Sequence, residues 1–123
     1  MTTPAPYAPT TTARQRVLRE RDVLRAVTER ARALGGLARR IAYIGRAGAP
    51  DLLVLLPRRQ PLLVEVKAPD GRLSPIQAAE HADIALTGHQ VHVVWSLEDV
   101  DRLMPPPDRA TPRHTAQETE PCR

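Results

Sequence analysis

This chain of 123 residues is predicted to fold as a single α/β domain, with a mixed sheet of about four strands flanked by helices in the order α-β-β-β-α-β-α. Three features predict this class: an amphipathic helical pattern near the N-terminus, two adjacent apolar runs that suit strands, and an alanine-rich helix followed by another apolar run. Residues 1–13 and 105–123 are rich in Pro and Thr and lack apolar periodicity, so we expect disordered tails there. The folded domain is therefore expected at residues 14–104.

The first helix is predicted over residues 16–34. With about 100° of rotation per residue, its apolar positions form one stripe, made of Val17, Leu24, Val27, Ala31 and Leu34. Glu20 falls within that stripe, where an acid is costly without a partner. Glu20 is therefore a candidate site residue, and pairing with a neighbouring arginine is the simpler alternative. The consecutive Gly35 and Gly36 are expected to end the helix.

Three strands are expected next. Residues 38–44 give a weak pattern, whereas residues 52–56 and 62–66 are continuous apolar runs joined by a turn at residues 57–60. Continuous apolar runs are typical of strands that are covered on both faces.

A second helix is predicted to begin at Pro75 and to end near Gly88. Ser74 suits its N-cap, proline suits the first helical position, and Gln77 stands where a capping box places Glu or Gln. A last strand is expected at residues 90–95 and a short helix at residues 96–104.

The charge of the chain is mild but unevenly distributed. The net charge is +4, yet residues 14–46 hold ten Arg against three acids, whereas residues 74–104 hold one Arg against five acids. This asymmetry suits a polyanionic partner that approaches from one side. The candidate phosphate contacts are the arginines of a helical stripe together with one arginine beyond the helix, namely Arg14, Arg21, Arg25, Arg32 and Arg46. An exposed helix face is the more common explanation of such a stripe.

Cysteine, histidine and hydropathy exclude several classes of protein. The single cysteine, Cys122, argues against a disulfide framework and a structural zinc site. The histidines lack metal-binding spacing, since His89 and His92 would face opposite sides of a strand and His81 has no helical partner four residues on. No apolar run of about 18 residues and no signal sequence are present. We expect a cytoplasmic protein with no membrane contact and no small-molecule cofactor.

The strongest chemical signal is a group of two acids and a lysine. Glu65 and Lys67 are two residues apart in a predicted strand, so their side chains project from the same face. Asp51 begins the preceding strand, and a three-residue loop after Leu56 would bring Asp51 opposite Glu65. A two-residue loop would shift the register and separate the two acids.

Opposed carboxylates repel each other unless a cation lies between them, and oxygen ligands suit Mg²⁺ or Mn²⁺. Such a site hydrolyses phosphodiesters, with Lys67 positioning the attacking water. Lys67 is the only lysine among the 18 Lys and Arg residues of the chain, and the other 17 are Arg. A lone lysine in such a chain marks a position that needs a compact charge. A solvated strand edge is the alternative explanation of Glu-x-Lys alone.

The segments Gly48-Ala49-Pro50-Asp51, Glu65-Val66-Lys67 and Leu73-Ser74-Pro75-Ile76-Gln77 closely resemble the VRR-NUC branch of the PD-(D/E)xK nuclease superfamily. The resemblance covers about residues 17–104 and implies a restriction-endonuclease-like fold of the stand-alone form found in phages and bacteria. It implies a metal held by the carboxylates of Asp51 and Glu65 and the carbonyl of Val66. By the same resemblance, Glu20 is similar to the family's helix-1 acid, which implies a catalytic and metal-binding role. Gln77 is similar to the family's helix-2 glutamine, which implies a catalytic role.

The resemblance further implies a likeness to Holliday-junction resolvases, and hence a homodimer and branched DNA as substrate. A metal-dependent DNA endonuclease is therefore the leading hypothesis. The alternatives are a catalytically weak DNA-binding module with the same fold, and an interaction protein in which Glu65 and Lys67 form a structural pair. The capping box explains Gln77 without catalysis, so both interpretations of this residue stay open.

Overall fold

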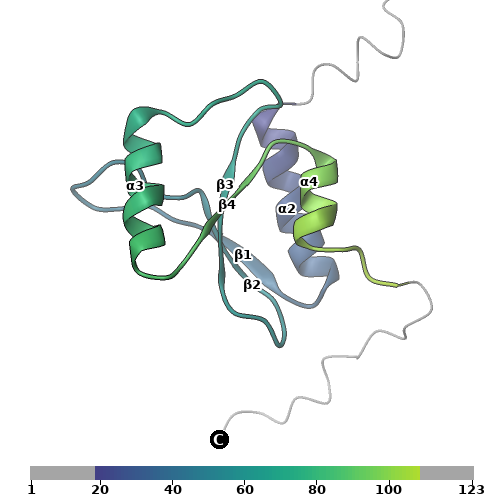
Figure 1. Ribbon diagram of the computed structural model, residues 1–123. Coiled ribbons are helices and arrows are strands. Elements are labelled where there is room, and N and C mark those ends of the chain that lie inside the picture. The colour runs from purple at the N-terminus through teal and green to yellow at the C-terminus, as the bar shows by residue number, and fades with distance from the viewer. Residues whose placement is uncertain (1–18, 109–123) are drawn as a thin grey trace, which may run out of the picture.

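The computed structural model describes residues 19–108 (Figure 1). The elements in chain order are α2 (Glu20–Ala33), β1 (Leu37–Arg40), β2 (Leu52–Leu55), β3 (Leu62–Val66), α3 (Pro75–Leu86), β4 (Val91–Val94) and α4 (Leu97–Leu103). This order confirms the predicted α-β-β-β-α-β-α arrangement. The expected N-terminal tail, most of the C-terminal tail, Arg14, Val17 and Cys122 lie outside the described residues.

The sheet is mixed, with the strand order β1-β2-β3-β4. The pairs β1–β2 and β2–β3 are antiparallel, whereas β3 and β4 are parallel and are connected through α3. Figure 1 shows α2 and α4 together on one side of the sheet and α3 on the other. The hydrophobic core lies mainly between the sheet and the α2–α4 pair, and its buried members are Val23, Val27, Ala31, Leu52, Val54, Leu56, Leu62, Val64, Val66, Val94, Val100 and Met104. None of the helices within residues 19–108 is long and apolar enough to cross a bilayer.

Helix α2 buries one narrow stripe and then ends at a pair of glycines. The buried residues are Val23, Val27 and Ala31, which are spaced four apart. The stripe predicted from the sequence did not include Val23, so the structure corrects the predicted phase of the helix. At the end of the helix, a Cβ on Gly36 would lie 2.1 Å from the carbonyl oxygen of Leu55. Only glycine allows the helix to turn this closely against β2.

The hairpin between β2 and β3 has the register that the sequence analysis favoured. Leu52 pairs with Val64 and Val54 with Leu62, so continuation of the same register places Asp51 opposite Glu65. This is the register that a three-residue loop after Leu56 would give, while the strands themselves end at Leu55 and resume at Leu62. The expected burial on both faces is wrong at the loop end of β2, where Leu55 is 38% exposed because no helix covers it.

The C-terminal half begins at the predicted cap. Ser74 Oγ accepts a hydrogen bond from Gln77 N at 3.1 Å, and Gln77 Oε1 accepts one from Ser74 N at 2.9 Å. Ser96 caps α4 through its side chain alone, by accepting from Asp99 N. The reciprocal cap at Ser74 and the single cap at Ser96 confirm the predicted helix starts.

The first strand is shorter than predicted, since β1 ends at Arg40 rather than near residue 44. Beyond Ile41, whose N–H donates to Asp51 O at 3.0 Å, the chain leaves the sheet and runs to α3. There the Tyr43 hydroxyl donates to Glu80 Oε2 at 2.9 Å. Residues 43–46 therefore make their polar contacts with α3 and not with a neighbouring strand.

Candidate active site

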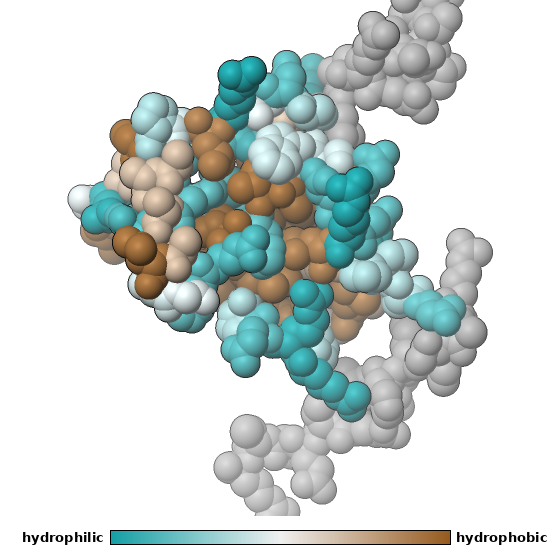
Figure 2. Space-filling view, viewed as in Figure 1, coloured by the Kyte–Doolittle hydropathy of each residue, from teal (hydrophilic) through white to brown (hydrophobic). Residues whose placement is uncertain are grey.

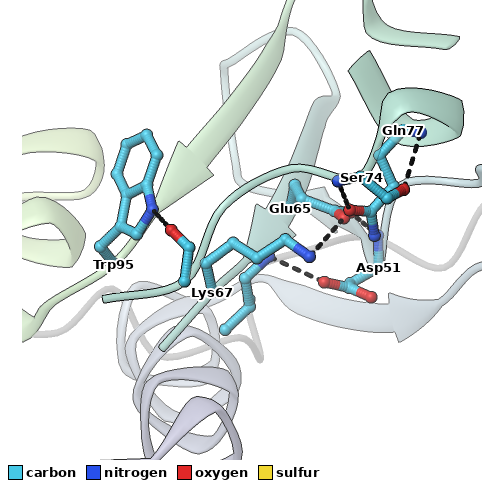
Figure 3. Close-up of polar contacts among 8 residues, drawn as sticks. Asp51, Glu65, Lys67, Ser74, Gln77 and Trp95 are labelled. Atoms are coloured by element: carbon cyan, nitrogen blue, oxygen red, sulfur yellow. Dashed lines mark hydrogen bonds and ion pairs between the residues drawn. The ribbon is translucent and has the colours of Figure 1, made fainter. Parts of the chain in front are cut away.

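Two carboxylates, from the start of β2 and from β3, form the centre of the site. The N–H of Asp51 donates to Glu65 Oε2 at 3.1 Å, and the N–H of Val66 donates to Asp51 Oδ2 at 2.8 Å (Figure 3). Each carboxylate is thus fixed through one oxygen by a backbone N–H of the opposite strand. The hairpin register creates this exchange and fixes the direction in which each acid points.

Glu65 is fully buried, with 0% of its surface exposed. Burial, followed by the nearby charge of Asp51, raises the pKa of Glu65 from its ordinary value of 4.5 to about 7, while the charge of Lys67 acts in the opposite direction. Its second oxygen, Oε1, is buried and accepts no hydrogen bond from the described residues. A buried acid in this condition is costly to ionise and is suited to a cation.

The lysine side chain lies beside this second oxygen. Lys67 Nζ is 3.9 Å from Glu65 Oε1, and the lysine side chain is only 14% exposed. The backbone N–H of Lys67 donates to Val94 O at 2.9 Å, which continues the pairing of β3 with β4 for one more residue. The strand geometry therefore keeps Glu65 and Lys67 on one face, as predicted from their spacing.

The donor set fits a hard divalent cation. It consists of the remaining oxygens of Asp51 and Glu65, and the orphaned buried oxygen of Glu65 is the observation that favours a metal. Within residues 19–108, no group of three or more His, Cys, Asp or Glu side chains is placed to hold a metal. Mg²⁺ does not require such a group, because it commonly keeps several waters and binds through one or two carboxylates.

Comparison with known proteins gives the family of the chain. The model of the VRR-NUC domain matches residues 13–96 of the chain. The protein belongs to the VRR-NUC family. Its nuclease class and its predicted α/β fold are therefore confirmed.

Two relatives of this VRR-NUC chain are informative. A protein of Acyrthosiphon pisum secondary endosymbiont phage 1, named "Putative nuclease p44", is 37% identical over 90 residues, which are 73% of this chain and 96% of the phage protein. A solved structure described as a VRR_NUC domain is 45% identical, with a TM-score of 0.64, and the match covers 68% of this chain and 91% of that one. Both matches span nearly the full length of the relatives.

Glu20, which resembles the family's helix-1 acid, does not form a metal-binding group with the carboxylate pair in the described part of the chain. Glu20 is the first residue of α2 and is exposed, although its position continues the buried stripe of the helix. It lines a surface pocket with Leu24 and Arg40, and Arg40 pairs with Leu52, the neighbour of Asp51. Glu20 therefore avoids the cost of burial that its place in the apolar stripe suggested, and its site role stays a prediction.

The helix-2 glutamine is engaged in its cap. Gln77 Oε1 is held by Ser74 N, so the capping interpretation is confirmed. A second role for Gln77 stays a prediction.

The arginines divide into two groups. Arg21, Arg25 and Arg32 are exposed on α2, as expected of a helix surface. Arg46 instead donates to Glu80 Oε1 at 2.9 Å and lies 3.7 Å from Asp83 Oδ2. Its charge is therefore partly neutralised within the protein, which makes it a weaker candidate for a phosphate contact than the three arginines on α2.

Sequence reasoning missed Glu80, the second buried acid of the described chain, which is 8% exposed. The hydrogen bond from Tyr43, followed by that from Arg46, lowers the pKa of Glu80 against the effect of burial. Burial and the same hydrogen bond raise the pKa of Tyr43. The sequence offered little signal for it, since α3 carries a second acid, Asp83, that is exposed. These bonds fix the segment before Asp51 to α3.

Trp95 was also missed. Its indole Nε1 donates to Gly71 O at 2.9 Å, which ties the loop after Lys67 to the end of β4 (Figure 3).

Proposed function

We propose that this VRR-NUC protein is a Mg²⁺-dependent endodeoxyribonuclease, with Mn²⁺ able to substitute, and that it cuts branched DNA as a cytoplasmic homodimer. The observation that carries the proposal is the carboxylate pair, in which Asp51 and Glu65 exchange backbone hydrogen bonds while one buried oxygen of Glu65 is left without a donor. Rigid, paired oxygens beside an ammonium group suit phosphodiester hydrolysis.

In the proposed reaction the protein supplies orientation and charge. Asp51, Glu65 and the Val66 carbonyl would hold the metal, which neutralises phosphate charge and acidifies a bound water. Lys67, with Nζ 3.9 Å from Glu65 Oε1, would orient the attacking water and stabilise the negative charge that develops on the phosphate. The backbone N–H groups that hold both acids fix this geometry before the substrate arrives.

Exposed arginines support DNA as the substrate. Arg21, Arg25 and Arg32 project from α2, and Arg39 and Arg40 are exposed on the edge strand β1 that packs beside it. We propose that these side chains contact backbone phosphates near the carboxylate pair. For each phosphate that an arginine contacts, log affinity should fall more steeply with log salt, by about 0.9 in the slope.

The outer face of α3 supports a dimer. Ile76 is 58% exposed and Leu86 is 87% exposed, and the alanines between them include the exposed Ala79, Ala82 and Ala85. Figure 2 shows this helix as an apolar ridge on the surface. Contiguous exposed apolar surface is typical of protein interfaces, and a symmetric pair would present two sites for paired cuts.

A cleavage panel tests the proposed function. Duplex, single-stranded, flap and four-way-junction DNA are incubated with Mg²⁺, with Mn²⁺ and with EDTA, while sedimentation reports the oligomeric state. We expect metal-dependent cutting of branched DNA and a loss of about 100-fold or more in Asp51→Asn and Lys67→Met. The matched control is Asp83→Asn, which changes an exposed acid on α3. Binding of every substrate without cutting would favour the DNA-binding module, and unchanged cleavage in Asp51→Asn would refute the site.

The role of Gln77 is separable from its cap. Glutamate and glutamine both complete a capping box, so Gln77→Glu should keep the thermal stability of α3. A selective loss of cleavage in this variant would assign the side-chain amide to the site. Unchanged cleavage would leave Gln77 as a capping residue alone.

A further inference from the structure

Two buried side-chain polar atoms of residues 19–108 have no hydrogen-bond partner, namely Glu65 Oε1 and His81 Nε2. Native proteins rarely leave such atoms unpaired, because the free-energy cost of their lost hydration is not recovered. The proposed metal accounts for the glutamate oxygen. Nothing in the proposed reaction so far accounts for the histidine nitrogen.

His81 lies on the face of α3 that is turned towards the sheet. The four least exposed positions of the helix are Gln77, Glu80, His81 and Ile84, and they are three or four residues apart, so they form one face. Gln77 stands one turn before His81 on that face. The imidazole is thus enclosed between α3 and the part of the sheet that carries the carboxylate pair.

Charged groups from three elements lie close enough to this imidazole to influence its pKa. Lys67 lies beyond the end of β3, Asp51 precedes β2, and Glu80 is the neighbour of His81 on α3. Burial, followed by the charge of Lys67, lowers the pKa of His81, and the two acids act in the opposite direction. The lowered pKa favours the neutral ring, which offers one acceptor nitrogen.

A second half-buried histidine shows that burial alone does not produce this arrangement. Burial also lowers the pKa of His92 on β4, but the charged neighbour there is Arg59. Neither ring nitrogen of His92 is a buried atom without a partner. His81 is thus distinguished by its charged neighbours and by its orphaned nitrogen.

We propose that His81 is a positioning residue for Lys67, whose Nζ donates to His81 Nε2 when Glu65 is engaged by the metal. This role rests on the proposed nuclease function. The ammonium lies 3.9 Å from Glu65 Oε1. A cation bound to Glu65 repels that ammonium, and a neutral acceptor holds it in the site without adding another charge. Because Lys67 and the imidazole nitrogen are both shielded from bulk water, this contact does not require the site to open.

The lone lysine allows a direct test by nuclear magnetic resonance. Lysine labelled with ¹³C at Cε, in the untagged chain, reports on Lys67 alone. With Mg²⁺ present, we expect the ε-methylene signal of the wild type to show two inequivalent protons and restricted motion. His81→Leu should make the two protons equivalent, and His81→Gln, which places an acceptor near the Nε2 position, should restore the difference. The matched control, His92→Leu, should give the wild-type signal.

Kinetics and stability complete the test. We expect His81→Leu to lower kcat by about 10- to 100-fold with little change in KM, and His81→Gln to recover most of the loss. The thermal midpoint of metal-free His81→Leu should be equal to or above that of the wild type, since the unpaired nitrogen is removed. Identical lysine signals in wild type and His81→Leu, or a destabilised variant with unchanged kcat, would overturn the proposal. A wild type that cuts no DNA would refute the nuclease, whereas the lysine signal would still decide the contact.

Discussion

Glu65→Gln should stabilise the metal-free protein at alkaline pH while abolishing catalysis. The substitution keeps the shape of the side chain and an oxygen that can accept from Asp51 N, but it removes a buried negative charge. The pKa of Glu65 is raised to about 7 in the folded protein, from an ordinary value of 4.5. A raised pKa means that ionisation opposes folding, so the stability contributed by this group is complete below pH 4.5 and is lost as the pH rises through about 7.

The size of the effect follows from the same values. Each pKa unit corresponds to about 1.4 kcal/mol, so the difference between 4.5 and about 7 corresponds to about 3 kcal/mol of lost folding free energy above pH 8. For a domain of this size the unfolding free energy is about 5–15 kcal/mol, so the loss is easily measured. Glu65→Gln lacks this loss and should be more stable than the wild type by up to about 3 kcal/mol at pH 8, and by less than about 1 kcal/mol at pH 5.

Urea unfolding in EDTA, followed by the fluorescence of the only tryptophan, Trp95, measures both proteins at pH 5 and pH 8. The matched control is Glu80→Gln, which changes the other buried acid of the described chain. Hydrogen bonds lower the pKa of Glu80, so its ionised form supports folding, and this variant should be destabilised at pH 8. A Glu65→Gln protein that is less stable than the wild type at pH 8, or that keeps the wild-type pH dependence, would refute the reasoning.

Three further predictions concern the metal, a glycine and a cap. Mg²⁺ at about 100 times its dissociation constant should raise the unfolding free energy of the wild type by about 2.7 kcal/mol and leave that of Asp51→Asn almost unchanged, as thermal melts will show. Gly48→Ala should cost about 1–3 kcal/mol, because Gly48 has φ +98° and a Cβ would lie 3.1 Å from Ile76 Cγ2, whereas Gly45→Ala, at φ +75° with nothing within 4 Å, should cost less. Ser74→Ala removes the N-cap of α3 and should lower the unfolding free energy by about 1 kcal/mol in urea titrations; no measurable change would contradict the capping role.

The central pair of the site was predictable from the sequence because strands have a period of two. Once the loop after Leu56 has three residues, the register of the hairpin places Asp51 opposite Glu65, and Lys67 follows on the same face. The cap at Ser74 was predictable for a similar reason, since the hydrogen bonds that form it are local. Features that depend on neighbouring residues in the chain can be read without a structure.

Features that depend on distant packing were not predictable. The predicted stripe of α2 included Glu20 and missed Val23, and only the packing of the helix shows that Val23 is buried while Glu20 is exposed. The pairing of Tyr43 and Arg46 with Glu80 joins segments more than 30 residues apart, and no periodicity records such a contact. His81 lacked a partner at helical spacing, and its charged neighbours come from the sheet.

The two buried acids have opposite physical roles, and together they explain how the site is held. Glu80 is stabilised by its donors and joins the segment before Asp51 to α3, where the backbone of Gly48 also approaches Ile76 closely. The segment before Asp51 is therefore bonded to α3, the helix that carries His81. The ionised form of Glu65 is destabilised by burial and by the charge of Asp51, and the proposed cation would supply the partner that its Oε1 atom lacks. The fold thus keeps one acid that strengthens the framework and one that weakens it, and the free energy released when a metal binds should be largest at the second.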